Sequence, residues 1–293
     1  GSNMKLDNLK PLLNACKPGD NLAAIDAIEN LLLNESKPGW IKELVKLKAF
    51  LTTGDVQFSV FIKDGNIKQP FLSFSGLPGT GFCPGSGDCV NFCYSFRAWR
   101  YPAAFCRQVQ NTFLLNSENG QAAILSALDN ILATRKFQKM DRVDFRLYVD
   151  GDFRSVEDIH FWMTTLRNRP KIACYGYSKS FLELLGYDTA LDVTGDTWPN
   201  NYLLNVSGGH KHAQSIVDHV KRLPITRGSF VAVTVGHKVT SKHHGTSEHN
   251  KVLRAAYAGK AFTCPGKCGT CTPSGHACGS DRFRDLDIII AIH

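Results

Sequence analysis

The sequence predicts an α/β protein: a TIM-like partial (β/α) barrel of about six parallel strands with an N-terminal helical extension. From residue 56 onward, short apolar runs alternate with amphipathic helical stretches, which is typical of βαβ units and a parallel sheet. About six runs are too few for a closed barrel of eight strands. No Gly-x-Gly-x-x-Gly follows the first run, which argues against a dinucleotide-binding sheet.

The runs that we expect to form strands are bounded by glycine-containing polar loops. They lie at 56–62, 70–74, 143–149, 172–175, 202–206, 229–235 and 288–292. Helices are expected at 117–136, 159–166, 180–186, 210–222 and near 247–258. Ser155 followed by Asp158 has the pattern of a helix N-cap.

Residues 1–55 are expected to form the helical extension, and 56–293 the barrel domain with its cysteine-rich loop at 264–278. Apolar residues recur three and four positions apart over 5–16, 22–34 and 38–52. Lys-Pro-Gly-Asp and Ser-Lys-Pro-Gly separate these stretches and fit helix ends followed by turns. The extension could serve as a cap or an interaction module.

The composition is that of an ordinary globular protein, with 43% apolar and 20% charged residues. No apolar run approaches the roughly 18–20 residues of a membrane span, and no signal segment follows the first residues. These features favour the cytoplasm of a bacterial host cell. In a reducing compartment, the ten cysteines are candidates for metal or cluster ligation. In a secreted protein they would instead form disulfides.

Four cysteines near the C-terminus give the strongest functional signal. Cys264, Cys268, Cys271 and Cys278 follow a C-x3-C-x2-C-x6-C spacing among glycines and prolines. Four thiolates suit zinc or an iron–sulfur cluster. A zinc ribbon usually has two C-x2-C pairs separated by a longer spacer, so the compact spacing favours a [4Fe–4S] cluster, with zinc as the alternative.

A second cysteine group, Cys83, Cys89 and Cys93, lies in another glycine-rich loop. Three thiolates can hold three irons of a [4Fe–4S] cluster and leave the fourth open, or can bind a catalytic zinc together with water. Cys106 is a candidate fourth ligand. The spacing leaves open whether this group forms a separate centre or shares one with the C-terminal group.

Polar side chains follow several of the expected strands, where loops build the active sites of parallel α/β folds. The candidate catalytic residues are Asp150, Asp152, Lys179 and His237, and the candidate cofactor-binding residues are Ser178 and Ser207. The acids would act as bases or ligands, and the cations would bind a small anionic substrate. The alternative is that these residues cap helices or lie in solvent.

The +8 net charge is concentrated in one region. Residues 210–254 carry eight Lys or Arg, two acids and seven of the ten histidines. Such a stretch could contact nucleic acid, although a solvated surface is the simpler interpretation, and no recognised nucleic-acid-binding motif accompanies it.

The order of motifs resembles the phage "gene product 88" family, found in bacteriophages and other mobile elements. The match rests on Cys83-Pro84-Gly85 with Cys89 and Cys93-Tyr94, on Gly151-Asp152-Phe153, on Tyr175 to Lys179, on Asn205-Val206-Ser207, and on the terminal cysteines. It covers roughly residues 70–280. The resemblance implies an iron–sulfur protein with a barrel-like core, but no particular reaction.

A looser similarity is to radical S-adenosylmethionine enzymes, which place a three-cysteine cluster after the first strand of a partial barrel. Their C-x3-C-x2-C spacing is absent at Cys83–Cys93 and occurs at Cys264–Cys271 instead. S-Adenosylmethionine is therefore kept only as a candidate cofactor. Two other functions stay open: a zinc-stabilised nucleic-acid-binding protein, and a redox or iron sensor that signals through its N-terminal helices.

Overall fold

The computed structural model describes residues 6–63, 71–79, 81–85, 99–233, 261–263, 277–279, 284–285 and 287–291. These residues include a seven-stranded sheet in which all neighbouring strands are parallel. The strands are β1 (Leu72–Phe74), β2 (Val143–Leu147), β3 (Ile172–Ser178), β4 (Tyr202–Ser207), β5 (Thr226–Val233), β6 (Ala261–Thr263) and β7 (Asp287–Ala291). The predicted parallel α/β class is confirmed.

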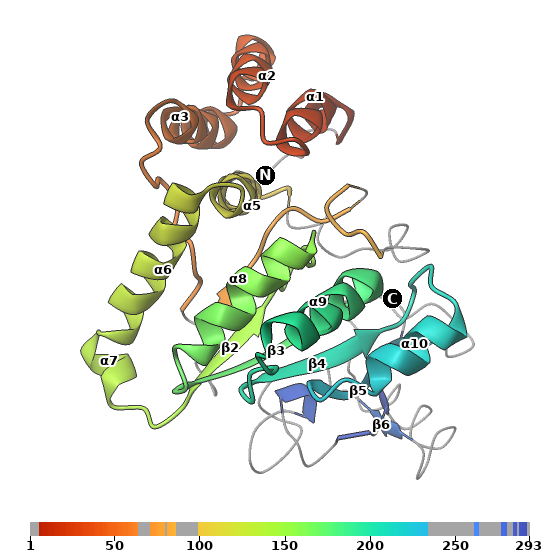
Figure 1. Cartoon of the computed structure of the whole chain (residues 1–293). Coiled ribbons are helices and arrows are strands. Elements are labelled where there is room, and N and C mark those ends of the chain that lie inside the picture. The colour runs from red at the N-terminus through yellow and green to blue at the C-terminus, as the bar shows by residue number, and fades with distance from the viewer. Residues whose placement is uncertain are drawn as a thin grey trace.

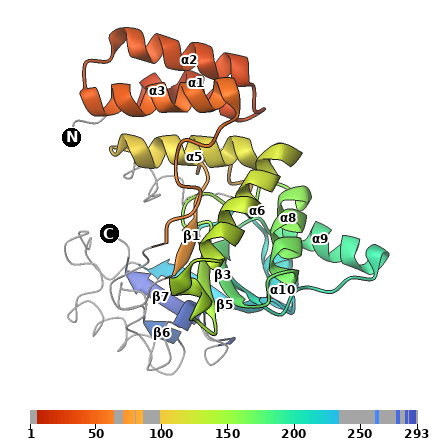
Figure 2. The same cartoon turned by 90° about the vertical axis from the view of Figure 1, so that its left-hand side faces the viewer.

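The strand order is β1-β2-β3-β4-β5-β7-β6, so neighbours follow the chain from β1 to β5. Helices connect successive strands: α5 (Pro102–Leu115), α6 (Glu118–Leu132) and α7 (Arg135–Gln138), then α8 (Val156–Arg167), α9 (Phe181–Thr194) and α10 (Gln214–Lys221). Because successive crossovers share one hand, α6, α8, α9 and α10 lie on the same side of the sheet (Figure 2). This order is consistent with a partial barrel, since a doubly wound sheet would reverse it.

The N-terminal extension consists of the three expected helices, α1 (Leu6–Cys16), α2 (Asn21–Asn34) and α3 (Pro38–Thr53). They lie beyond α5 at one end of the molecule (Figure 1), and α1 and α3 both contact α5. Trp40 of α3 packs against Phe105 of α5 with ring centroids 5.9 Å apart. One cluster of buried apolar residues runs from α1 to the helices that cover the sheet. None of the described helices is long and apolar enough to span a bilayer.

The segment 56–62 was expected to be a strand, but apart from one bridge between Ile62 and Ser73 it joins no sheet. Side chains of α5 satisfy its backbone instead. Gln110 accepts hydrogen bonds from the amides of residues 57 and 58, both at 2.9 Å, and Asn111 donates to the carbonyl of Val60 at 3.0 Å. These buried polar residues interrupt the apolar periodicity of α5, which explains why the sequence did not predict this helix.

Two further elements differ from expectation. Helix α9 continues to Thr194, well beyond the predicted end at residue 186, and stops at Gly195 in the left-handed conformation (φ 78°). Strand β6 was not predicted. The helix expected near 247–258 lies outside the described residues.

The two faces of the sheet have different chemistry because side chains alternate along each strand. Val143, Phe145 and Leu147 of β2 pack into the main hydrophobic cluster, on the side of the covering helices. The opposite face carries Arg146, Tyr175, Tyr177, Asn205 and Phe230, by their position in the strand register. We call this face, opposite the covering helices, the inner face. A short 3-10 helix, η3 (Ala277–Gly279), contacts β3 and β4.

The end of β2 is held by a buried hydrogen-bond network. Tyr148 adopts a positive φ of 57° and donates its hydroxyl to Asp158 Oδ2 at 2.5 Å. Ser155 caps α8 by accepting from the amide of Asp158 at 3.1 Å, as the sequence predicted. Burial raises the pKa of Asp158 from 3.8 to about 6, although the Tyr148 hydroxyl and the Arg154 amide oppose that rise.

This pKa predicts a specific pH dependence of stability. Because the folded protein binds the Asp158 proton more tightly than the unfolded chain, its stability should rise as pH falls through 6. Between pH 7 and pH 5, the unfolding free energy of the wild type should gain roughly 1 kcal/mol relative to Asp158→Asn, since one pKa unit is worth about 1.4 kcal/mol. Urea denaturation of both proteins at the two pH values measures this difference. The same pH dependence in both would contradict the assignment.

Candidate functional site at the carboxyl ends of the strands

The loops after β1 and β2 are joined at Asp150. Its carbonyl accepts from the amide of Gly76 at 3.0 Å, and its amide donates to Ser75 Oγ at 3.2 Å. Gln108 of α5 donates to Asp150 Oδ2 at 2.9 Å and accepts from the indole of Trp99 at 2.8 Å. The Asp150 side chain is therefore oriented by a helix that sequence reasoning had missed.

The loops after β2 and β3 are joined at Asp152, whose side chain is buried. Oδ1 accepts from Ser178 Oγ at 2.7 Å and from the amide of Phe153 at 2.8 Å, and Oδ2 accepts from the amide of Lys179 at 2.8 Å. Burial raises the pKa of Asp152, while these donors and the charge of Lys179 oppose the rise. Both carboxylate oxygens thus accept hydrogen bonds from the chain itself, and these bonds hold the two loops together.

The first cysteine group begins at this same edge of the sheet. Gly85 lies so close to Lys179 that a Cβ would overlap the Lys179 carbonyl, and its own carbonyl accepts from the amide of Lys211 at 3.3 Å. His212 Nε2 bonds to the Lys179 carbonyl at 2.8 Å. The Cys83–Gly85 segment therefore lies across the ends of β3 and β4, as expected if β1 is the first strand of the barrel.

Two histidines complete this edge of the site. The rings of His210 and His212 lie 4.9 Å and 4.7 Å from the Phe181 ring, measured between centroids. His210 Nδ1 accepts from the amide of His212 at 3.1 Å. Burial, followed by the charges of His212 and Lys179, lowers the pKa of His210. His210 is thus kept neutral at pH 7, beside the Lys179 ammonium.

The structure brings three of the predicted rim residues together, Asp152, Ser178 and Lys179, and Asp150 lies two residues before Asp152 in the loop after β2. Ser207 lies buried at the end of β4, beside Phe230 of β5. Within the described residues, the Lys179 ammonium makes no hydrogen bond or ion pair. His237 lies outside them, as do Cys89, Cys93, Cys264, Cys268 and Cys271.

Cys278, the last cysteine of the C-terminal group, is buried against the inner face, with 8% of its surface exposed. Asn205 of β4 donates to the Cys278 carbonyl at 3.1 Å and to that of Gly176 at 3.0 Å. The Tyr177 hydroxyl hydrogen-bonds to the Cys278 side chain; burial, followed by the charge of Cys278, raises the pKa of Tyr177.

Arg227 of β5 brings a cation to the same place. It is 0% exposed, and its guanidinium donates to Asn205 Oδ1 and to the carbonyl of Ser229. Burial lowers its pKa, whereas the charge of Cys278 raises it, followed by the charges of Tyr177 and Asp287. The Cys278 sulfur is thus near a hydroxyl donor and a buried guanidinium.

The cysteines of the described residues that belong to neither group are core thiols. Cys16, Cys106 and Cys174 are all buried in the main hydrophobic cluster. Burial raises the pKa of Cys16 to about 12, and it also raises the pKa of Cys106 and of Cys174, so all three are held as neutral thiols. Cys106, considered above as a fourth ligand, therefore has the environment of a packing residue.

Sequence reasoning assigned no role to Tyr177, Asn205, Arg227 and His212. A signal for the first two was present, because polar and aromatic residues recur at every second position of their strands, as expected for a face that is not packed on helices. Arg227 and His212 carried no comparable signal, since their roles depend on contacts with distant segments. No three His, Cys, Asp or Glu side chains of the described residues gather in a metal-binding group.

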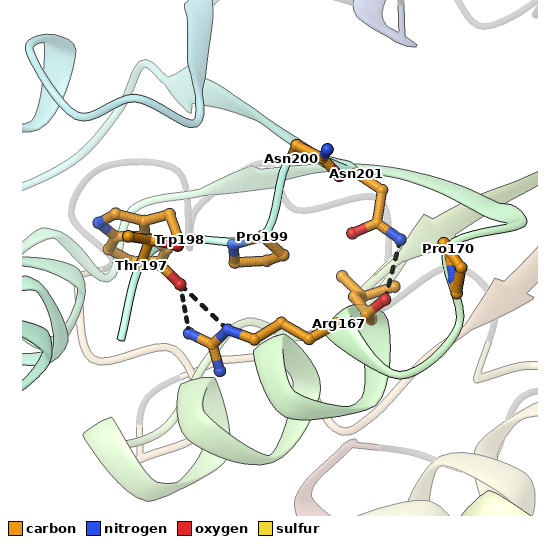
Figure 3. Close-up of a pocket in the computed structure, with 8 residues that line it drawn as sticks. Arg167, Pro170, Thr197, Trp198, Pro199, Asn200 and Asn201 are labelled. Carbon is orange, nitrogen blue, oxygen red and sulfur yellow. Dashed lines mark hydrogen bonds between the residues drawn. The ribbon is translucent and has the colours of Figure 1, made fainter. Parts of the chain in front are cut away.

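A pocket of about 250 Å³ lies at the other end of the strands, near the starts of β3 and β4 (Figure 3). Its lining includes Arg167, Trp198 and Asn201. The Arg167 guanidinium donates twice to the Thr197 carbonyl, at 3.0 and 2.8 Å, and once to the Tyr187 hydroxyl at 2.7 Å. These bonds tie α8 to the loop before β4, so the pocket wall has a structural role.

Comparison with known proteins supports the motifs described above. No curated protein and no solved structure shows a significant match to the chain. The family model described as Gene product 88 matches residues 62–285, which is well over half of the 293 residues. The match spans β1 to β6, both cysteine groups and the rim residues, and it begins after the three N-terminal helices. The chain therefore belongs to the gene product 88 family.

Proposed function

We propose that this protein binds an iron–sulfur cluster and that Cys264, Cys268, Cys271 and Cys278 hold a [4Fe–4S] centre on the inner face of a partial (β/α) barrel. The position of Cys278 carries the proposal. Its thiol lies in a small cluster with Tyr175 and Ile288 on the inner face, beside the Tyr177 hydroxyl and near Arg227, whereas the other buried cysteines of the described residues lie in the main hydrophobic cluster. A buried thiol with a hydroxyl and a guanidinium nearby suits a ligand better than a thiol in a wholly apolar core does.

The groups around Cys278 fit an anionic centre. A centre with four thiolate ligands carries net negative charge, and a buried charge is costly unless an opposite charge or hydrogen-bond donors accompany it. Arg227 supplies a buried cation, and Tyr177 and Asn205 supply donors to Cys278. Outer-shell partners of this kind orient ligands and tune the centre that they hold.

We assign Cys83, Cys89 and Cys93 to a second centre at the rim. Support comes from the spacing of the three cysteines and from the place of Cys83, whose loop lies beside Lys179 and His212. When bound, such a centre would supply one-electron chemistry. S-Adenosylmethionine remains a candidate partner for it.

The rim residues support an anionic small-molecule substrate. Lys179 presents an ammonium group that makes no hydrogen bond or ion pair with a described residue. The adjacent Asp152 carboxylate instead accepts hydrogen bonds from Ser178 and from the Lys179 amide. In this proposal Lys179 binds the anionic group, with His237 as a second cation, while Asp152 holds the Lys179 backbone in place. We assign Asp150 as the acid that acts on a substrate, since Gln108 of α5 orients its side chain at the rim.

Metal content tests the ligand assignment. After anaerobic purification, Cys268→Ala should lose most of the iron and acid-labile sulfide, because a missing ligand opens the cluster. Cys89→Ala should lose only the share that belongs to the second centre. Cys174→Ala is the matched control, since this cysteine is buried outside both groups, and it should retain wild-type iron.

Metal analysis together with visible absorption spectra measures these contents. A colourless wild-type protein with stoichiometric zinc and no labile sulfide would contradict the proposal and favour the zinc alternative. Binding to nucleic acid that weakens steeply with salt would then identify the basic 210–254 region as the functional one.

The Tyr177 hydroxyl offers a finer test of the inner-face site. Tyr177→Phe should keep full metal content but release the metal to a chelator several-fold faster, because one hydrogen bond to a ligand is worth about 1 kcal/mol. Tyr187→Phe is the matched control, since its hydroxyl binds Arg167 at the far end of the sheet. Equal release rates in the three proteins would show that Tyr177 does not support the centre.

A further inference from the structure

The N-terminal helices lie outside the residues matched by the family, yet they contact the loop of the first cysteine group. The match begins at residue 62, and α1 to α3 end at Thr53. Lys17, directly after α1, nevertheless lies against Gly81, and Arg154, which bonds to Lys17, lies over the ring of Phe82 next to Cys83. These contacts are independent of the identity of any metal centre.

Arg154 is the first link. Its Nη2 donates to the carbonyl of Lys17, directly after α1, at 2.8 Å. The same guanidinium lies 5.3 Å from the centroid of the Phe82 ring, within the range of a cation–π contact, and Phe82 is buried. Arg154 thus bonds the residue that follows α1 and also lies over the ring of the residue before Cys83.

Lys17 is the second link. Gly81 adopts a φ of 91°, and a Cβ built on it would lie 2.8 to 3.3 Å from three carbons of the Lys17 stem. The aliphatic part of Lys17 therefore lies directly over Gly81. The amides of Phe82 and Cys83 both donate to the carbonyl of Gly79, at 3.0 and 2.9 Å, which makes this segment a closed turn. A displacement of Gly81 would therefore also move the backbone of Cys83.

Helix α1, which precedes Lys17, is packed into the core. Leu12 and Cys16 of α1 are 0% exposed, and α1 contacts both α2 and α5. The position of Lys17 is consequently set by the packed core and not by the loop that it covers.

We infer that Arg154 and Lys17 are positioning residues for Cys83, and that the N-terminal helices act as a fixed clamp on the turn that carries it. The extension is then a working part of the site. Its contribution is to hold the turn that carries Cys83 against the ends of β3 and β4.

Thiol reactivity of the full-length protein tests the clamp. Arg154→Ala should raise the rate of Cys83 alkylation by iodoacetamide several-fold, as measured on the Cys83 peptide by mass spectrometry, and Arg154→Lys should restore part of the protection. Arg167→Ala is the matched control, because Arg167 also stacks on an aromatic ring and donates to a backbone carbonyl, but at the far end of the sheet. Cys106 in the same digest reports global opening, since it is fully buried.

A glycine pair provides a second, independent variant. Gly81→Ala adds a methyl group under Lys17, whereas Gly195→Ala imposes a similar backbone strain at φ 78° with no atom within 4 Å. Only the first should expose Cys83. The inference is overturned if Cys83 reacts at the wild-type rate in both Arg154→Ala and Gly81→Ala, if the control variants expose it equally, or if Cys106 becomes reactive in parallel. Iron content is measured on the same samples, because exposure of Cys83 at unchanged iron content reports the clamp, whereas exposure that accompanies loss of iron reports the second centre.

Discussion

The buried carboxylate of Asp152 is the constraint on which the rim depends. A carboxylate without water is tolerated only when its oxygens are hydrogen-bonded, and here the three donors come from the loops after β2 and β3. Satisfying Asp152 fixes the backbone of Lys179. Gly85 in turn packs against the Lys179 carbonyl, and His212 hydrogen-bonds to it. One desolvated charge thus determines where the first cysteine loop lies.

The winding of the sheet accounts for the second part of the site. Because the strands from β1 to β5 follow the order of the chain, their helices gather on one face and leave the other to different chemistry. A closed barrel fills its interior with branched apolar side chains. Here the inner face mixes apolar residues with two arginines, two tyrosines and an asparagine, and Cys278 packs against Tyr175 and Ile288. This face therefore offers charged and hydrogen-bonding groups that the interior of a closed barrel lacks.

The sequence predicted the elements whose signals are local. The three N-terminal helices, the Ser155 cap and most of the strands follow from apolar periodicity and turn residues over a few positions. It also placed Asp150, Asp152 and Lys179 at one edge, because parallel strands end together. It did not predict α5, and it predicted a strand at 56–62 where the chain is extended but joins no sheet. Gln110 and Asn111 satisfy that backbone from a helix about fifty residues away. The place of Cys278 depends on Asn205 and Arg227, which no local pattern links to it.

The same distinction between local and distant signals bears on what a family match can explain. The matched residues contain β1 to β6, the rim and both cysteine groups, but Arg154 within the match bonds to Lys17 outside it. One hydrophobic cluster includes both regions, so loosening the extension would also disturb the packing under α5. Gln108 of α5 orients Asp150, and Lys17, directly after α1, lies over Gly81 in the turn before Cys83. Because α1 packs on α5, both parts of the rim depend on the same group of helices. The geometry of the site in this chain is therefore a property of the whole assembly of helices, extension included.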